Sequence, residues 1–221
     1  MISHKFKCIF IHIPKCAGTS VEKKLGHLDV YEGYYMQDHR TVKNLQPLPY
    51  GQILRKDIFQ EFIDRGLRRL KKQHNPMNRL VVSKRQYEEY FKFTTVRNPF
   101  ARIFSYYTAV SVDKKAQLSD ETASFEDWLF RNIDHDNLRP QTDYLEDFDG
   151  NINMDFIVKF ENFDEDFKKV CDRLGVENND MPHMGKNKYD RSYQECFNGR
   201  TRALIEERHA KDLALFGYSF D

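Results

Sequence analysis

The segment PKCAGTS, residues 14–20, combines the residue types that a phosphate-binding loop needs. It follows an apolar run, KCIFIHI at 7–13, and precedes VEKKLG at 21–26, which is predicted as a short helix closed by Gly26. The first backbone N–H groups of a helix have no partner within it, so they can bind an anion. The segment therefore predicts a binding site for a phosphorylated nucleotide.

The side chains of this loop support the same interpretation. Ala17 and Gly18 are small enough to let the backbone approach a phosphate closely. Thr19 and Ser20 add hydroxyl donors, and Lys15 adds a mobile positive charge. An ordinary strand-to-helix turn would explain a glycine and a proline here, but not the lysine together with two hydroxyls.

The position of the lysine distinguishes this loop from a Walker A motif. In that motif, GxxxxGK[ST], the lysine follows the last glycine and the next hydroxyl binds Mg²⁺. Here Lys15 comes three residues before Gly18. A lysine at the entrance of the loop lies near the end of the strand, where it can contact the bridging oxygen of a group that is being transferred.

A second segment, TTVRNPFARIFSYY at 94–107, carries a further candidate anion site. Arg97 follows the strand-like run 91–96, and α/β proteins bind ligands at the carboxyl edge of their sheets. Its guanidinium can donate two parallel hydrogen bonds to a phosphate, and Ser105, two turns into the next helix, could meet the same anion. A surface salt bridge for Arg97 and a plain helical position for Ser105 are the alternatives.

Together the two segments resemble those of the carbohydrate-type sulfotransferases, the Golgi-type, heparan sulfate 2-O-like group with small bacterial members. These enzymes use 3′-phosphoadenosine 5′-phosphosulfate (PAPS). In that family a PKxxGTS-like loop holds the 5′-phosphosulfate, and an RxPxxRxxSxY-like segment holds the 3′-phosphate. Both occur here in the expected order, at 14–20 and 97–107, and the runs at 155–163 and 215–220 extend the likeness more weakly.

The resemblance implies PAPS as the donor co-substrate, no metal, and an acceptor hydroxyl that we expect on a saccharide. Arg97 and Ser105 would bind the 3′-phosphate. Cys16 stands where many relatives carry another small residue, so only its backbone N–H is expected to contribute. The residues implied for the 5′ side are Lys15, Cys16, Ala17, Gly18, Thr19 and Ser20. The residues in a segment that closes over the ligands in relatives are Lys186, Asn187, Lys188 and Arg191.

A base must accept the proton of the acceptor hydroxyl, and histidine titrates near the working pH. His39 fits, because relatives carry a histidine after the first loop for this purpose, and Lys15 is the second residue to which the resemblance assigns a catalytic role. A surface histidine in a polar loop is the alternative. Glu22 and Glu32 are the fallback bases, of which Glu22 is expected to be a solvated residue of the first helix.

Two other function classes are compatible with a phosphate loop. A P-loop kinase or other phosphotransferase needs Mg²⁺ and a carboxylate at a strand end, for which Glu161 is the candidate. The early Lys15 and the missing GK[ST] count against it. A noncatalytic nucleotide-binding or scaffold protein would keep Arg97 and the loop, but it would have no use for a base at His39.

The composition fits one domain and excludes some classes. The chain has 221 residues, 40% hydrophobic and 31% charged, with a net charge of +1, which argues against a dedicated nucleic-acid binder. No apolar run approaches the ~20 residues that span a bilayer, and the run 8–13 is too short for a signal peptide, so a cytoplasmic protein is expected. Oligomeric state and acceptor identity are not disclosed by the sequence.

The four cysteines are scattered, which predicts reduced thiols rather than disulfides. Cys8, His12 and Cys16 recur every four residues, but a strand followed by a loop would not place them on one helical face. No metal site is therefore expected here.

Alternating strands and helices predict an α/β fold, with a P-loop-NTPase-like three-layer architecture, a central and mainly parallel sheet, and a single domain over 1–221. The predicted strands are 7–13, 80–83, 91–96 and 154–160. The predicted helices are 21–26, 53–73, 84–90, a helix starting at Pro99, 125–133 with Ser124 as N-cap, 163–174 ending at Gly175, and 200–215. In the helix 53–73, apolar residues recur at helical spacing. The other face, at 65–72, is basic, and this face is either solvated or attractive to an anionic glycan.

Overall fold

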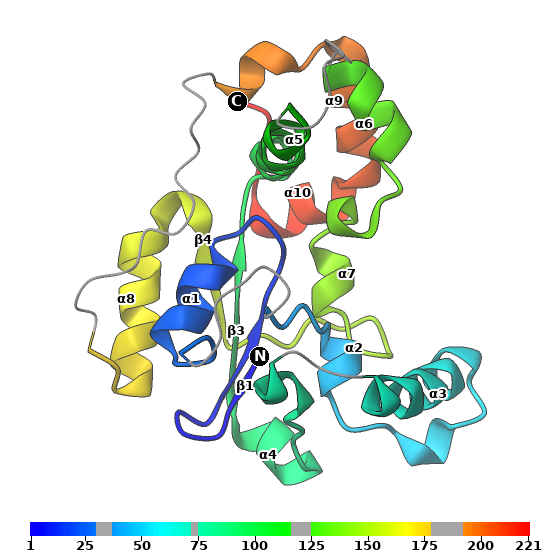
Figure 1. Cartoon of the computed structure of the whole chain (residues 1–221), viewed down its shortest axis with the longest axis vertical. Coiled ribbons are helices and arrows are strands. Elements are labelled where there is room, and N and C mark those ends of the chain that lie inside the picture. Colours follow the sequence, from blue (N-terminus) through cyan, green and yellow to red (C-terminus); the bar gives the residue numbers. More distant parts are fainter. Residues whose placement is uncertain (30–36, 72–74, 116–124, 178–191) are drawn as a thin grey trace.

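A four-stranded sheet forms the centre of the protein, in the order β1-β2-β3-β4 (Figure 1). This computed structural model describes residues 1–29, 37–71, 75–115, 125–177 and 192–221. Strands β2 (Cys8–Ile11), β3 (Phe91–Val96) and β4 (Phe156–Lys159) are parallel neighbours. The short β1 (Ile2–Ser3) pairs antiparallel with β2. The predicted α/β fold with a mainly parallel sheet flanked by helices is confirmed.

Ten α-helices are present in the described part of the chain. Their bounds are α1 (Gly18–Lys24), α2 (Val42–Leu45), α3 (Lys56–Leu70), α4 (Lys84–Glu89), α5 (Pro99–Lys115), α6 (Phe125–Asn132), α7 (Thr142–Leu145), α8 (Phe163–Leu174), α9 (Gly199–Arg208) and α10 (Ala210–Phe216). Short 3₁₀ turns are η2 (Tyr50–Gln52), η3 (Pro76–Arg79), η4 (Asp136–Leu138), η5 (Phe160–Asn162) and η6 (Tyr193–Cys196). No described helix is long and apolar enough to cross a membrane.

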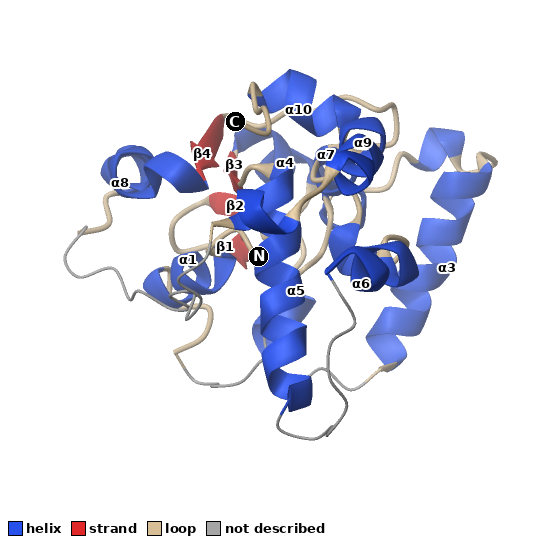
Figure 2. Cartoon of the chain, turned by 90° about the horizontal axis from the view of Figure 1, so that it is seen from above, coloured by secondary structure: helices blue, strands red, loops and turns tan. Residues whose placement is uncertain are grey.

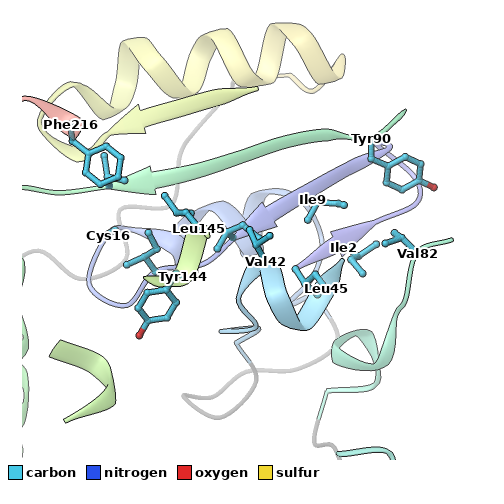
Figure 3. Packing of buried hydrophobic residues seen from close by; sticks show 13 residues of the cluster. Ile2, Ile9, Cys16, Val42, Leu45, Val82, Tyr90, Tyr144, Leu145 and Phe216 are labelled. Atoms are coloured by element: carbon cyan, nitrogen blue, oxygen red, sulfur yellow. The ribbon is translucent and has the colours of Figure 1, made fainter. Parts of the chain in front are cut away.

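Both faces of the central strands are covered, which is why β2 is apolar throughout and β3 is buried from residue 92 to residue 96. Cys8 and Phe10 of β2 point to the face covered by α1 and α8. Ile9 and Ile11 point to the opposite face, where they pack with residues of α2, α7 and α10 (Figure 3). The two clusters give the three predicted layers. All four cysteines are free thiols, as predicted.

The register of the sheet decides where the chemistry can lie. Ile11 is paired with Thr94, and Val96 is paired with Lys159. Because these strands are parallel, their carboxyl ends meet at one edge of the sheet. The segments that follow β2 and β3 therefore leave the sheet side by side.

Two predicted elements differ from the structure. Residues 80–83 form no strand, because β1 pairs with β2 on that side; Val82 packs against the cluster that contains Ile2, and Ser83 caps α4 through Gln86. The C-terminal helix is two helices that meet at His209. The predicted N-cap Ser124 lies outside the described residues.

The orientation of α3 is opposite to that of an ordinary surface helix. Ile58 and Glu61 are its buried residues, while its other large apolar residues face outward. Arg65 and Arg68, which were predicted on a face that is either solvated or attractive to an anionic glycan, turn inward and form ion pairs with Glu61. The amphipathic pattern thus identified the helix correctly but not the face that it buries.

Asp212 of α10 joins the last helices to the sheet edge. Its buried carboxylate accepts hydrogen bonds from the backbone N–H groups of Gln141 (2.7 Å) and Thr142 (2.9 Å), and it contacts His209 Nδ1 at 3.3 Å. Burial alone would raise the pKa of Asp212, but these donors hold it below its ordinary value. The ionised carboxylate therefore stabilises the folded state at neutral pH.

We expect Asp212→Asn to lower the free energy of unfolding by roughly 2–4 kcal/mol, because an amide N–H₂ would face buried N–H donors. Asp212 contributes to the free energy of unfolding above its unfolded pKa of about 4, and this contribution is lost as the pH falls toward the lowered folded pKa. The stability of the variant should therefore depend less on pH in the acid range than that of the wild type. Urea unfolding followed by circular dichroism measures both effects. Asp134→Asn, at an exposed carboxylate, is the control; equal losses in the two variants would contradict the role of Asp212.

Candidate functional site

The loop between β2 and α1 has a strained backbone. Lys15 and Ala17 have φ values of 69° and 62°, in the left-handed region that side chains disfavour. Such strain is typical of functional sites that bind a ligand with the backbone. A Cβ atom on Gly18 would overlap the imidazole ring of His12, so the chain requires a glycine there even without a phosphate.

Side chains of the loop alternate between the interior and the surface. Lys15, Ala17 and Thr19 are half-buried, while Cys16 and Ser20 are buried. The Cys16 thiol donates to the Oε1 atom of Gln141 at 3.4 Å, and burial raises its pKa to about 12. The cysteine side chain is therefore neutral and packs in the interior. Only the backbone N–H of Cys16 could then contribute to ligand binding.

Arg97, at the end of β3, contacts this loop directly. Its Nη1 donates to the backbone oxygen of Lys15 at 3.4 Å, and its backbone N–H donates to Gln141 Oε1 at 2.9 Å. The guanidinium lies over the ring of Phe160, 4.1 Å from the centroid. Its buried Nε has no hydrogen-bond partner in the described part of the chain. Burial also lowers the pKa of Arg97, so this desolvated cation with an unused donor would gain from an anionic ligand.

A cavity of about 640 Å³ opens beside Arg97. Phe160, Tyr193 and Tyr218 give it aromatic walls. Ser105 is not among its lining residues; it lies half-buried on α5, and no hydrogen bond joins it to Arg97 within the described residues. The structure thus brings the loop and Arg97 together and leaves the role of Ser105 as a prediction.

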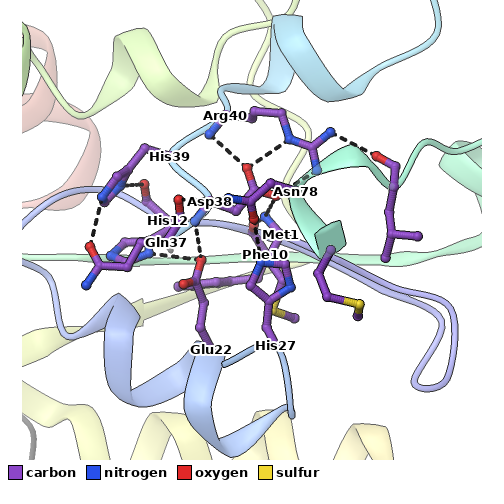
Figure 4. Close-up of polar contacts among 12 residues, drawn as sticks. Met1, Phe10, His12, Glu22, His27, Gln37, Asp38, His39, Arg40 and Asn78 are labelled. Carbon is purple, nitrogen blue, oxygen red and sulfur yellow. Dashed lines mark hydrogen bonds and ion pairs between the residues drawn. The ribbon is translucent and has the colours of Figure 1, made fainter. Parts of the chain in front are cut away.

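His39 reaches the opposite side of the loop through a chain of polar contacts (Figure 4). Its Nδ1 lies 3.2 Å from the backbone oxygen of His12, and its Nε2 lies 3.0 Å from Gln37 Oε1. The Gln37 amide nitrogen in turn donates to Thr19 Oγ1 at 2.7 Å. The histidine predicted as the base is therefore linked to a hydroxyl of the predicted phosphate loop.

The protonation state of His39 follows from its surroundings. Burial, followed by the charge of the neighbouring His12, lowers the pKa of His39 to about 4, so the ring is neutral at pH 7. A neutral imidazole has one N–H, which can donate to the backbone oxygen of His12. Turning the Gln37 amide by 180° would let it donate to Nε2 while accepting from Thr19, which satisfies every group. Nε2 is then the atom that can accept a proton.

Glu22 is not the solvated residue that the sequence predicted. It is fully buried, its Oε1 lies 3.1 Å from His12 Nδ1, and the same atom accepts from the Asp38 N–H at 3.0 Å. Burial alone would raise the pKa of Glu22, but His12 holds it below its ordinary value. Glu22 therefore supports the histidines rather than facing an acceptor. Glu32, the other fallback base, lies outside the described residues.

Asp38, next to His39, anchors this part of the chain. Its buried carboxylate pairs with Arg40 at 2.7 Å and with the amino group of Met1 at 3.2 Å. Burial would raise the pKa of Asp38, but these two cations hold it well below its usual range. The residue before the candidate base is thus fixed by ion pairs.

A second cavity, of about 590 Å³, lies beside His39 and is rich in arginine. The arginines that line it are Arg40, Arg65, Arg68, Arg69 and Arg79. Three of them pair with Asp38 or Glu61, whereas Arg69 and Arg79 form no ion pair within the described residues. The cavity therefore has a positive charge excess next to the candidate base.

Several site residues carried no recognisable signal in the sequence. Gln141 lies in an irregular segment, and its contacts with Cys16 and Arg97 span 125 and 44 residues. The sequence spacing of His12 suggested only a metal site, which was not expected. Its contact with Glu22 could not be predicted, because it depends on the packing of α1. Lys186, Lys188 and Arg191 lie outside the described residues. In the described part no group of three His, Cys, Asp or Glu side chains could hold a metal ion.

Comparisons with known proteins identify the family of the chain. The chain is similar to an uncharacterized protein of Archaeoglobus fulgidus, with 32% identity over 101 residues, or 45% of this chain and 80% of that protein. No solved structure gave a significant match. The model of the sulfotransferase family matches residues 1–219, almost the full length. The chain therefore belongs to the sulfotransferase family.

Proposed function

We propose that this sulfotransferase uses PAPS as its donor and transfers the sulfuryl group to a hydroxyl of an anionic saccharide, with His39 as the base. One observation carries the proposal: the loop 14–20 contacts Arg97 on one side and, through Gln37, His39 on the other. A loop in this position can hold a donor between an anion-binding arginine and a neutral base.

The donor site follows from the charges and the cavity beside Arg97. The loop backbone and Lys15 would hold the 5′-phosphosulfate, and Arg97 would hold the 3′-phosphate with its unused Nε donor. The aromatic walls at Phe160 and Tyr218 suit a nucleoside. A 3′-phosphate is the group that distinguishes PAPS from ATP, and the proposal assigns Arg97 to it.

The reaction requires one proton acceptor and stabilisation of one leaving group. As the acceptor oxygen forms its bond to sulfur, the bond between sulfur and the 5′-phosphate oxygen breaks, and the hydroxyl proton passes to His39 Nε2. Gln37 must release this nitrogen first. Lys15 and the loop N–H groups stabilise the negative charge that grows on the departing phosphate. The products are a sulfate ester and adenosine 3′,5′-bisphosphate.

The arginine-rich cavity supports an anionic acceptor. It adjoins His39, and a volume of about 590 Å³ suits a sugar unit. Arg69 and Arg79, which have no internal ion-pair partner among the described residues, could pair with carboxylate or sulfate groups. This supports a saccharide that already carries negative charge.

The rival functions are less well supported. A kinase would need Glu161 as a Mg²⁺ ligand, but both of its oxygens accept hydrogen bonds, from the Asn98 N–H at 2.8 Å and the Tyr218 hydroxyl at 2.6 Å. A noncatalytic protein would have no need for a neutral histidine held beside the loop.

Adenosine 3′,5′-bisphosphate should raise the melting temperature of the protein without added metal, because a ligand that binds only the folded state stabilises it. A thermal-shift titration measures this. ATP with Mg²⁺ is the comparison. Stabilisation by ATP with Mg²⁺ but not by the bisphosphate would refute the PAPS proposal. The variant Arg97→Gln should lose most of the shift caused by the bisphosphate.

His39→Ala should reduce sulfuryl transfer by about 100-fold or more, and Lys15→Ala by a similar factor. Transfer of labelled sulfate to a saccharide acceptor measures both. His4→Ala and Lys23→Ala, at exposed positions, are the matched controls. In the wild type, the rate should hold down to about pH 5 and fall near pH 4, since His39 must be neutral. Undiminished transfer by His39→Ala would exclude it as the base.

Arg69→Gln should raise the KM for a uronic-acid-containing oligosaccharide about tenfold and leave kcat nearly unchanged, because it removes a charge that binds the acceptor without touching the reacting atoms. Steady-state transfer kinetics in the absence of lipid test this. Arg131→Gln, an exposed arginine on α6 that does not line the cavity, is the control. If a neutral oligosaccharide suffers the same rise in KM, the acceptor need not be anionic.

A further inference from the structure

Helix α3 is attached to the protein by its polar face and by the buried Ile58, which packs with Leu48 and Phe148. Glu61 is buried and pairs with Arg65 and Arg68 of the same helix. Arg65 also donates to the backbone oxygens of Lys43 and Gln46, both at 2.7 Å. The charged side of this amphipathic helix is thus used for docking to the body of the protein, and the apolar side is left facing outward.

The outward side forms a continuous apolar stripe along the helix. The side chains of the stripe, with their exposed fractions, are Phe59 (53%), Phe62 (45%), Ile63 (40%), Leu67 (51%) and Leu70 (84%). Their spacing of three and four residues places them on one face. Together they expose apolar area on the order of 500 Å², which is the size of the largest apolar patch on a typical monomer, a patch that is often functional. Helix α3 also lies at the outer edge of the molecule in two perpendicular views (Figures 1 and 2).

Basic residues surround the stripe. Lys56, Arg69 and Lys71 are exposed and form no ion pair within the described residues. The acidic residue Asp57 is paired with Arg55, Glu61 is paired inside, and Asp64, which accepts a hydrogen bond from Gln60, is the one acidic residue of α3 without an ion pair among the described residues. The free charge around the stripe is therefore mainly positive, which complements an anionic surface.

We propose that α3 binds an anionic lipid membrane, with the stripe inserted at the boundary between headgroups and acyl chains. Phenylalanine and leucine on one face with lysine and arginine beside them are typical of helices that lie in this boundary. A second copy of the chain fits less well, because two stripes would bury about 1,000 Å² at best, less than the roughly 1,600 Å² of a standard stable interface.

The same helix lines the arginine-rich cavity through Arg65 and Arg68 and through Arg69, which is also exposed beside the stripe. A membrane-bound protein would therefore hold this cavity within one helix diameter, about 10 Å, of the lipid headgroups. The membrane proposal stands on the stripe and its charges and does not depend on the proposed donor, base or acceptor.

Co-sedimentation with vesicles tests the proposal without using transfer activity. The wild type should bind vesicles of phosphatidylcholine with phosphatidylglycerol, bind phosphatidylcholine alone at least tenfold more weakly, and dissociate as salt increases. Phe59→Gln/Leu67→Gln should weaken binding about tenfold or more. The matched control is Phe130→Gln/Leu215→Gln, at similarly exposed positions of α6 and α10 (43% and 52%), which should bind like the wild type.

Exposed side chains contribute little to folding, so the stripe variant should keep the urea midpoint of the wild type. Lys56→Gln/Lys71→Gln is a second variant that leaves the stripe intact and should weaken binding to anionic vesicles only. Three results would overturn the proposal: no binding of the wild type to anionic vesicles, equal losses in the stripe and control variants, or a lipid-free dimer in analytical ultracentrifugation that the stripe variant abolishes.

Discussion

The parallel pairing of β2 with β3 is the constraint on which the candidate site depends. Because Ile11 lies beside Thr94, the loop that follows one strand meets the arginine that follows the other. The hydrogen bond from Arg97 to the Lys15 backbone and the shared contacts with Gln141 are consequences of this register. A shift of one residue would reverse the faces of β2 and separate these groups.

Two buried carboxylates hold the loop from opposite sides. Asp212 fixes the backbone of Gln141, which contacts both Cys16 and Arg97. Glu22 contacts His12, whose backbone oxygen orients His39. Each carboxylate is kept ionised by donors that outweigh its burial. The loop is therefore positioned by charged groups of the interior that do not themselves reach the proposed ligands, an arrangement that limits its freedom before any donor binds.

The sequence predicted the parts of this site that are local. Runs of apolar, aromatic and β-branched residues predicted β2, β3 and β4. The loop 14–20 and Arg97 were predicted because their residue types stand together in short segments. The prediction that Glu22 is solvated was wrong, because its burial depends on His12 across the loop and not on its neighbours in the helix. The face that α3 buries was not predicted, because helical spacing identifies an apolar face but not the surface against which the helix packs. Gln141 could not be found, because its role exists only through contacts between distant segments.

The glycine that opens α1 has a consequence for how this site can vary. The space that a side chain would occupy at position 18 is filled by the ring of His12, whose backbone oxygen holds His39. The two positions share one volume, so their substitutions cannot be independent. A larger residue at 18 is tolerable only with a smaller one at 12, and the free-energy effects of the two changes should be strongly non-additive. The loop and the pair formed by His12 and His39 are thus coupled through packing.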